Sequence, residues 1–342
     1  MRGKGITYDT GFLSARTSTR EPFDPEVVRR EMRIIRDDLH CNAVRVTGGY
    51  RDRLAIAAAH AADAGLEVWF CPFTNGLTRR ELLEMFAECA DRADGLRKRT
   101  EVVFLTGSEL TLLTLGFLPG DTLQERFALL SAPHRLRPLM ADLRASVNRF
   151  LGEALDVVRA RFGGKVSYAS LPFEGVDWTP FDIISSDAGY RTAQAAARFR
   201  DDVRAFVAQG KALGKPVAFT EFGCTTHRGA PEITGHGDLD IIEWGEDARP
   251  VRLKGEFTRD EDEQARYISE LLDVFEAEGV DTAFVNTFAR YDLPHRDAPQ
   301  EDFDMASFGV VKVLEGRRGQ TYSDMPWEPK VAFATLSARY GQ

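Results

Sequence analysis

The stretch KPVAFTEFG, from Lys215 to Gly223, decides how we interpret the fold. Pro216 suits the first position of a strand, and the apolar run after it has the length of a strand that is buried on both faces. Glu221 follows where this strand should end. Parallel α/β folds keep their chemistry at the carboxyl ends of their strands, so Glu221 is either a catalytic carboxylate or a helix-capping or loop carboxylate.

A pattern of strand followed by helix repeats about eight times along the chain. We expect strands at residues 5–8, 41–46, 66–72, 102–106, 166–171, 181–186, 217–220 and 282–287. No linker interrupts this rhythm and no GxGxxG motif follows the first strand, so the pattern favours a (β/α)₈ TIM barrel over an open doubly wound sheet. We expect one domain over residues 1–342, with long βα loops after strands 4, 7 and 8.

Local signals place several helix ends. Asp24 followed by Pro25 predicts the start of one helix, and the pairs Thr78/Glu81 and Thr258/Glu261 have the spacing of capping boxes at the start of two others. The connection between strands 5 and 6 is too short for a full helix.

The composition is that of a globular protein with a large core. Of the 342 residues 43% are hydrophobic and 28% are charged. A net charge of −9 argues against nucleic acid or an anionic membrane as partner. The N-terminus lacks the apolar core of a signal peptide, and no segment has the length of a membrane span, so we expect a cytoplasmic protein. The four cysteines show no metal-ligand spacing, so we expect reduced thiols and neither a metal nor a cofactor.

A second carboxylate stands at another strand end. The segment LTGSEL, residues 105–110, places Glu109 directly after the fourth strand. In a closed barrel Glu109 and Glu221 would project at the same face, across one cavity. Such a pair suits acid/base or nucleophilic chemistry, and retaining glycosidases hold their two carboxyl groups roughly 5–5.5 Å apart.

At these residues the chain resembles the large clan of retaining (β/α)₈ glycoside hydrolases, which carry the acid/base Glu after strand 4 and the nucleophile Glu after strand 7. KPVAFTEFG is similar to the nucleophile strand of that clan, and LTGSEL to the acid/base strand. The resemblance implies that Glu109 is the acid/base and Glu221 the nucleophile. It implies that Arg45 and Tyr190 hydrogen-bond Glu221, and Arg45 should lower the pKa of that carboxyl. Structural ion pairing for Arg45 and packing for Tyr190 are the alternatives.

The chain departs from the clan at two positions. Ser108 stands where the clan has an Asn that contacts the sugar 2-hydroxyl, and Asn286-Thr287-Phe288 lacks the Trp that serves as a sugar platform, with Phe288 as its nearest aromatic. Contacts to the 2-hydroxyl strengthen in the transition state, so the first departure favours a 2-deoxy or 2-substituted glycoside.

Further candidates for the cleft come from their places near strand ends. Asp9, Asp187 and Asn286 could bind hydroxyl groups, and His227 and His295 lie in loops after strands 7 and 8. Trp178 and Trp244 could stack on a sugar but are equally consistent with packing. Cys224 has no identified base partner and receives no catalytic role.

Three functions are compatible with this pattern. The leading hypothesis is a retaining glycosidase-like hydrolase acting on a small glycoside. The same carboxylate pair could instead perform acid/base chemistry on another metabolite, or the barrel could be an inactive module that binds carbohydrate or a partner.

Overall fold

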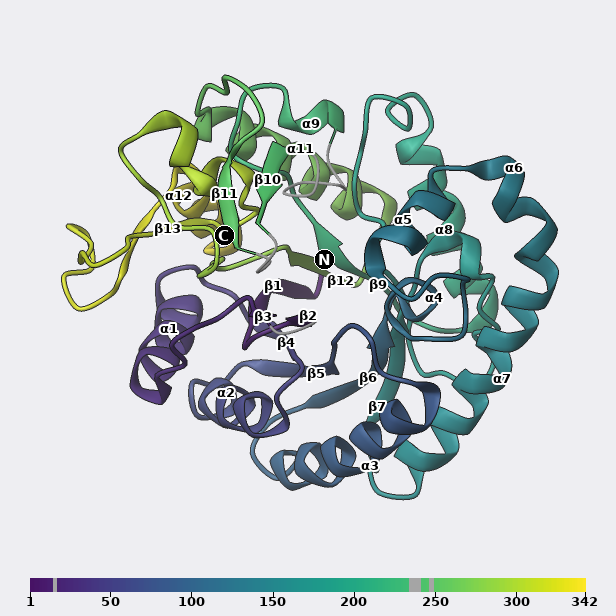
Figure 1. Ribbon diagram of the computed structural model, residues 1–342. Coiled ribbons are helices and arrows are strands. Elements are labelled where there is room, and N and C mark those ends of the chain that lie inside the picture. Colours follow the sequence, from purple (N-terminus) through teal and green to yellow (C-terminus); the bar gives the residue numbers. More distant parts are fainter. Residues whose placement is uncertain (15–16, 234–240, 246–248) are drawn as a thin grey trace.

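The computed structural model describes residues 1–14, 17–233, 241–245 and 249–342. The long loop expected after strand 7 falls partly outside these residues. Eight parallel strands form one sheet that curls into a nearly closed barrel, with helices arranged around its outside (Figure 1). The barrel strands are β1 (Gly3–Asp9), β4 (Ala43–Gly48), β5 (Glu67–Pro72), β6 (Val102–Ser108), β7 (Lys165–Ala169), β8 (Ile184–Ser186), β9 (Val217–Phe222) and β12 (Thr282–Val285).

The strand order β7-β6-β5-β4-β1-β12-β9-β8 confirms the TIM-barrel prediction. Because every pair along this order is parallel, all eight carboxyl ends meet at one rim. The helices around the barrel are α1 (Pro25–Asp37), α2 (Arg51–Asp63), α3 (Arg79–Leu96), α7 (Met140–Arg159), α8 (Phe199–Leu213), α11 (Glu261–Glu278) and α12 (Val331–Tyr340).

Shorter elements occupy the loops. After β6 lie α4 (Leu110–Leu113), α5 (Leu123–Leu130), α6 (Pro133–Leu136) and the 3₁₀ turn η1 (Arg137–Leu139). After β9 lie α9 (Ala230–Ile233) and the hairpin β10 (Ile242–Trp244) with β11 (Pro250–Leu253). The remaining elements are β2 (Leu13–Ser14), β3 (Thr17–Ser18), η2 (Pro172–Glu174), η3 (Pro299–Glu301), η4 (Phe303–Ala306), β13 (Val311–Val313) and β14 (Trp327–Pro329).

Two of the three predicted helix starts are confirmed, those at Asp24 and Thr78. The Asp24 side chain accepts from the Glu26 backbone N–H at 2.9 Å, and Thr78 forms its capping box with Glu81. The third prediction is wrong, because α11 is capped by Asp260, which accepts from the Glu263 N–H at 2.9 Å.

The carboxylate of Glu261 has other partners that explain this difference. It accepts from Lys312 at 3.0 Å and from Arg259 at 3.2 Å. Two cations therefore hold the side chain that would otherwise have reached back to Thr258, and the helix begins two residues later than the capping-box spacing suggests.

Among the neighbouring strands of the barrel, β7 and β8 have the least backbone pairing. A single parallel bridge, Ser170 to Ser186, joins these strands, and serine hydroxyls supply further contacts. Ser167 donates to the Ile183 carbonyl at 2.8 Å, and Ser170 donates to the Ser185 carbonyl at 2.8 Å. The connection between the two strands contains only the 3₁₀ turn η2, as its length predicts. Residues 170–183, all of them described, therefore contain no α-helix.

Candidate active site

The Glu221 carboxylate lies near the carboxyl end of β9 and is held at both oxygens. Arg45, a buried residue of β4, donates to Oε1 at 2.7 Å. The Tyr190 hydroxyl donates to Oε2 at 3.0 Å, and the Asn286 amide donates to the same oxygen at 3.3 Å. Asn286 also donates to the Tyr190 oxygen at 3.1 Å. Three residues from different βα units therefore fix one carboxylate, whose side chain remains 17% exposed.

Glu109 sits in a sharp turn directly after β6. Its φ of 46° is in the left-handed region, which costs a residue with a Cβ roughly 1–2 kcal/mol. The turn is tied down on both sides, since the Glu109 N–H donates to the Ala169 carbonyl at 3.0 Å and the Leu110 N–H donates to the Tyr168 hydroxyl at 2.8 Å. Among the described residues none donates a hydrogen bond to the Glu109 carboxyl group, which is only partly buried. This carboxyl group is held by its backbone and keeps both oxygens free.

A third carboxylate, Asp187, lies beneath these two. Its side chain is fully buried, with Oδ1 3.4 Å from Arg45 Nη1, and Oδ2 accepts a hydrogen bond from the Ser108 hydroxyl. The sequence analysis named Asp187 as a possible hydroxyl-binding residue and Ser108 as a departure that removes a sugar contact. Both side chains are buried in this structure, and the Ser108 hydroxyl is directed at Asp187. We call Glu109, Asp187 and Glu221 the carboxyl cluster.

Burial and neighbouring carboxylates raise the pKa of Glu109 and of Glu221. Burial, then Asp187, then Glu221 raise the pKa of Glu109 well above its ordinary value. Burial and Asp187 also raise the pKa of Glu221 to about 7. Arg45 acts in the expected direction and lowers it, but burial and Asp187 outweigh the guanidinium. The expectation of a net lowering is therefore wrong.

Two other candidates, Asp9 and Phe288, have structural contacts in this arrangement. Asp9 accepts from the Gly11 N–H at 2.8 Å, from the Phe12 N–H at 3.1 Å and from the Thr19 hydroxyl, and so closes the loop after β1. Phe288 is fully buried, which rules it out as a sugar platform here. Its ring packs against Tyr8 and Trp327, with centroids at 6.1 and 5.3 Å.

The His227 ring is also turned away from solvent. Its Nδ1 lies 3.1 Å from the Thr225 hydroxyl and 3.2 Å from the Met305 carbonyl, and the ring packs against Phe257. These contacts give His227 a structural place in the loop after β9. His295 has a similar role, with Nδ1 2.9 Å from Asp302.

The remaining candidates lie in hydrophobic surroundings. Trp178 is buried against Phe181, and Trp244 packs on the cluster that includes Ile242 and Leu253. Cys224 is buried, and burial raises its thiol pKa. An unreactive thiol agrees with the absence of a catalytic role for this residue in the sequence analysis.

The sequence analysis missed a buried support beneath Glu109. Glu174, in η2, is fully buried and accepts from the Tyr168 hydroxyl at 2.7 Å and from the Thr111 hydroxyl at 2.7 Å. It also accepts from the Leu171 N–H at 2.8 Å. Tyr168 in turn accepts from the backbone just after Glu109. The contact with Thr111 could not be predicted locally, because Thr111 lies 63 residues away in the chain.

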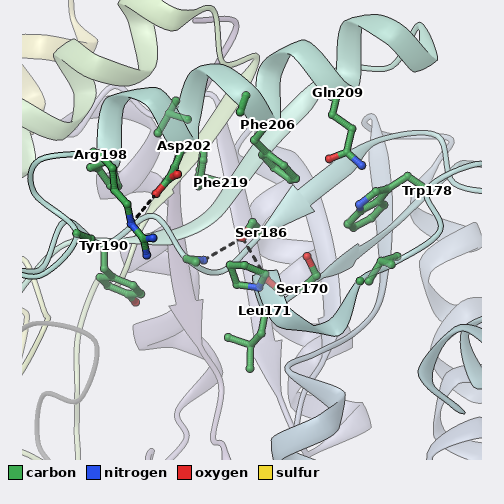
Figure 2. Close-up of a pocket in the computed structure, with 18 residues that line it drawn as sticks. Ser170, Leu171, Trp178, Ser186, Tyr190, Arg198, Asp202, Phe206, Gln209 and Phe219 are labelled. Carbon is green, nitrogen blue, oxygen red and sulfur yellow. Dashed lines mark hydrogen bonds and ion pairs between the residues drawn. The ribbon is translucent and has the colours of Figure 1, made fainter. Parts of the chain in front are cut away.

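A cavity of about 580 Å³ lies outside the barrel, between α8 and residues 170–178. Figure 2 shows Phe206 and Trp178 on its walls, with Tyr190 at the end opposite Trp178. It occupies the side of β8 that the short β7–β8 connection leaves without a helix. Tyr190 is the one residue that both lines this cavity and contacts Glu221 among the described parts of the chain.

Within the same described ranges, no group of three or more His, Cys, Asp and Glu side chains is placed to hold a metal ion. None of the helices in these ranges has the length and apolar character needed to cross a membrane.

Solved structures of glycoside hydrolases share this fold. A GH113 β-1,4-mannanase superposes with a TM-score of 0.61 at 18% identity, with 100% of both chains covered. The GH113 β-mannanase of Alicyclobacillus acidocaldarius gives 0.61 at 18% identity, covering 99% of this chain and 97% of that one. The β-glucuronidase of Parabacteroides merdae gives 0.58 at 15% identity, covering 100% of this chain but 37% of the glucuronidase.

No protein-family model matches the chain, and no curated protein sequence matches it significantly. At these identities the likeness to solved structures establishes the fold alone: the chain forms a (β/α)₈ barrel like those of these glycoside hydrolases.

Proposed function

We propose that this protein is a glycosidase-like hydrolase that acts with retention, with Glu221 as nucleophile and Glu109 as acid/base. The observation that carries the proposal is the contrast between the two carboxyl groups. Glu221 is fixed at both oxygens by Arg45, Tyr190 and Asn286, whereas Glu109 keeps both oxygens free. A nucleophile must be aimed at one carbon, and an acid/base must exchange its proton with the leaving oxygen and then with water.

The protonation of the pair supports these roles. Arg45 and Tyr190 hydrogen-bond the Glu221 carboxylate and lower its pKa, whereas no described residue donates to the Glu109 carboxyl group, whose pKa is raised by burial, Asp187 and Glu221. We therefore assign the proton of the pair to Glu109 and the negative charge to Glu221. In the first step the Glu221 carboxylate attacks the sugar carbon while Glu109 gives its proton to the departing oxygen. In the second step Glu109, now ionised, takes a proton from the water that releases the sugar from Glu221.

For the substrate we propose a small β-glycoside, preferably one that lacks or masks the 2-hydroxyl. The mannanases and glucuronidases that share the fold act on mannan and on glucuronides, as their names state, which supports a carbohydrate. The preference rests on Ser108, whose hydroxyl is committed to Asp187 and cannot also serve a sugar oxygen in this arrangement. A lost contact at this position would be worth several kcal/mol in the transition state.

A panel of aryl glycosides tests the reaction. We expect turnover of at least one β-glycoside, with the β-configured sugar as first product by NMR, and faster turnover of 2-deoxy or 2-amido analogues than of the plain sugar. First appearance of the α-configured sugar would contradict retention. Rapid turnover of plain β-glucoside or β-mannoside without such a preference would contradict the substrate proposal.

Two variants separate the roles of the pair. Glu221→Gln should lose activity on every substrate, whereas Glu109→Gln should lose much more on poor leaving groups than on activated aryl glycosides, which need little protonation. Glu153→Gln, at an exposed position of α7, is the matched control and should keep full activity. Equal losses on both substrate types would contradict Glu109 as the acid.

One observation favours a second candidate function. A carboxyl group with a pKa of about 7, as in Glu221, is suited to abstract a proton from a carbon acid or hydroxyl at neutral pH. The carboxyl cluster could then perform non-hydrolytic acid/base chemistry on another metabolite. Turnover of a carbonyl or hydroxy-acid substrate, together with inertness towards every aryl glycoside, would select this alternative.

A further inference from the structure

Among the described residues, Arg45 is the one cation that pairs with the buried Asp187 carboxylate, and Arg45 also pairs with Glu221. Arg45 Nη1 lies 2.7 Å from Glu221 Oε1 and 3.4 Å from Asp187 Oδ1, so the guanidinium favours Glu221. Within the described residues no group donates a hydrogen bond to Asp187 Oδ1. The Asp187 charge is therefore compensated at one oxygen by Ser108 and only partly at the other.

An anion in this position acts on both of its carboxyl neighbours. The Ser108 hydroxyl that it accepts from belongs to the residue directly before Glu109, which ties Asp187 to the end of β6. Repulsion in a buried site disfavours a second negative charge, and Asp187 is the largest cause after burial for the raised pKa of both Glu109 and Glu221.

The other charged and titratable groups around the carboxyl cluster do not account for this effect on both residues. Arg45, from β4, opposes it at Glu109 and at Glu221. Glu174, from η2, raises the pKa of Glu109. Tyr190 hydrogen-bonds Glu221 and lowers its pKa, and the Cys71 thiol, from β5, lies 3.7 Å from Arg45.

We propose that Asp187 is a positioning residue that acts through its charge to keep Glu109 in the proton-donating form while Arg45 holds Glu221 ready to ionise. Asp187 does not touch substrate, because its side chain is fully buried. This inference rests on the proposed roles of Glu109 and Glu221 as acid/base and nucleophile. The protonation of Glu109 and Glu221 then depends on a third carboxyl group, that of Asp187.

The test follows the titration of individual glutamates and needs no substrate. The full-length protein is labelled with ¹³C at the glutamate side-chain carboxyl carbon, and the signals of Glu109 and Glu221 are assigned by their loss in Glu109→Gln and Glu221→Gln. Asp187→Asn should lower the titration midpoints of both residues, with a shift for Glu109 of about one pH unit or more, the range expected for removal of a close like charge. Asp156→Asn, at an exposed position of α7, is the matched control and should move neither.

A second pair of variants guards against a purely structural effect. Ser108→Ala removes the donor but keeps the charge, and should leave Glu109 titrating well above its ordinary range. Glu174→Gln should lower the Glu109 midpoint and leave the Glu221 midpoint in place. Unchanged midpoints in a folded Asp187→Asn protein would overturn the proposal, as would a Ser108→Ala protein in which the Glu109 midpoint falls to its ordinary range.

The outcome is separable from the proposed function. If the midpoints shift as stated but no glycoside is turned over, the role of Asp187 in setting protonation stands and the proposed reaction fails. If a glycoside is turned over, both limbs of the pH profile of kcat/KM should move to lower pH in Asp187→Asn. A profile identical to that of the wild type would overturn the role of Asp187 while leaving the proposed reaction intact.

Discussion

The proposed reaction needs Glu221 ionised and Glu109 protonated. Burial and Asp187 raise the pKa of Glu221 to about 7, and burial, Asp187 and Glu221 raise the pKa of Glu109 well above its ordinary value. We therefore expect kcat/KM to rise with pH through about 7 as Glu221 ionises, and to fall again at higher pH as Glu109 loses its proton. A pH profile on an activated aryl glycoside checks this. An acidic limb near pH 4, the ordinary value for a glutamate, would show that Arg45 outweighs burial and Asp187 after all.

The raised pKa of Glu109 also has a consequence for stability. Its folded-state pKa lies above its unfolded-state value, so its contribution to stability is fully present below about pH 4.3 and is lost as pH rises towards the folded-state pKa. Glu109→Gln does not titrate and loses no side-chain hydrogen bond to the described residues. At pH 8 the variant should be more stable than the wild type by about 1 kcal/mol or more, and the advantage should shrink by pH 5.

Thermal unfolding at the two pH values measures this difference, with Glu153→Gln as the control that should match the wild type at both. An advantage of equal size at pH 5 and pH 8 would mean that the substitution acts on packing or on the strained backbone and not on the buried charge.

Some side-chain contacts of the candidate site could be predicted from the sequence, and others could not. The place of Glu221 follows from its position at a strand end, because parallel strands bring their carboxyl ends to one rim. The contacts of Arg45 and Tyr190 with Glu221 were expected only from the resemblance to the retaining (β/α)₈ clan, and the structure has both. The pairing of Ser108 with Asp187 does not follow, since a side chain at a strand end can point at substrate or at a neighbour. Only the packed barrel decides between these directions.

At the scale of elements, the turn that carries Glu109 depends on the short connection between β7 and β8. Glu174 in that connection accepts hydrogen bonds from Tyr168, Thr111 and Leu171 while fully buried. Glu174→Gln replaces one accepting oxygen with a donor and leaves at least one buried partner unsatisfied. We expect a loss of roughly 1–3 kcal/mol in the free energy of unfolding and a drop in activity.

Urea unfolding of Glu174→Gln beside the exposed Glu153→Gln provides the measurement. A Glu174→Gln protein as stable as the control would show that the buried support beneath Glu109 contributes little to stability.

The same connection shows what the sequence can predict of an element and what it cannot. Its length excludes a full helix, and η2 agrees with this. The hydrogen bonds from Ser167 and Ser170 that join β7 to β8 could not be predicted. A serine hydroxyl can bond to solvent or to a backbone carbonyl, and the distance between the two strands decides which partner it finds. The prediction for the start of α11 at Glu261 was wrong for a related reason. The Glu261 carboxylate binds Lys312, which is distant in sequence, and Arg259, which is no part of the capping-box pattern.

At the scale of the whole molecule, the barrel brings together groups that lie far apart in the chain. Arg45 lies within β4, and Glu109, Asp187 and Glu221 lie at the carboxyl ends of β6, β8 and β9, so residues from four strands of the parallel barrel meet at one site. The strand count and order were predictable because a buried parallel strand leaves an apolar run at each repeat. This order brings the fixed Glu221 carboxylate and the free Glu109 carboxyl group together beside the buried Asp187. We propose that this arrangement gives the protein its activity.

Covalent labelling of Glu221, the proposed nucleophile, tests that claim most directly. The protein is incubated above pH 7 with 2-deoxy-2-fluoro glycosyl fluorides of the manno, gluco and glucurono series, and the product is analysed by intact mass and peptide mapping. We predict one glycosyl group per chain on Glu221 and no adduct in Glu221→Gln. An adduct on another residue, or a protein that hydrolyses aryl glycosides yet forms no adduct with the fluoride of the same sugar, would contradict the account.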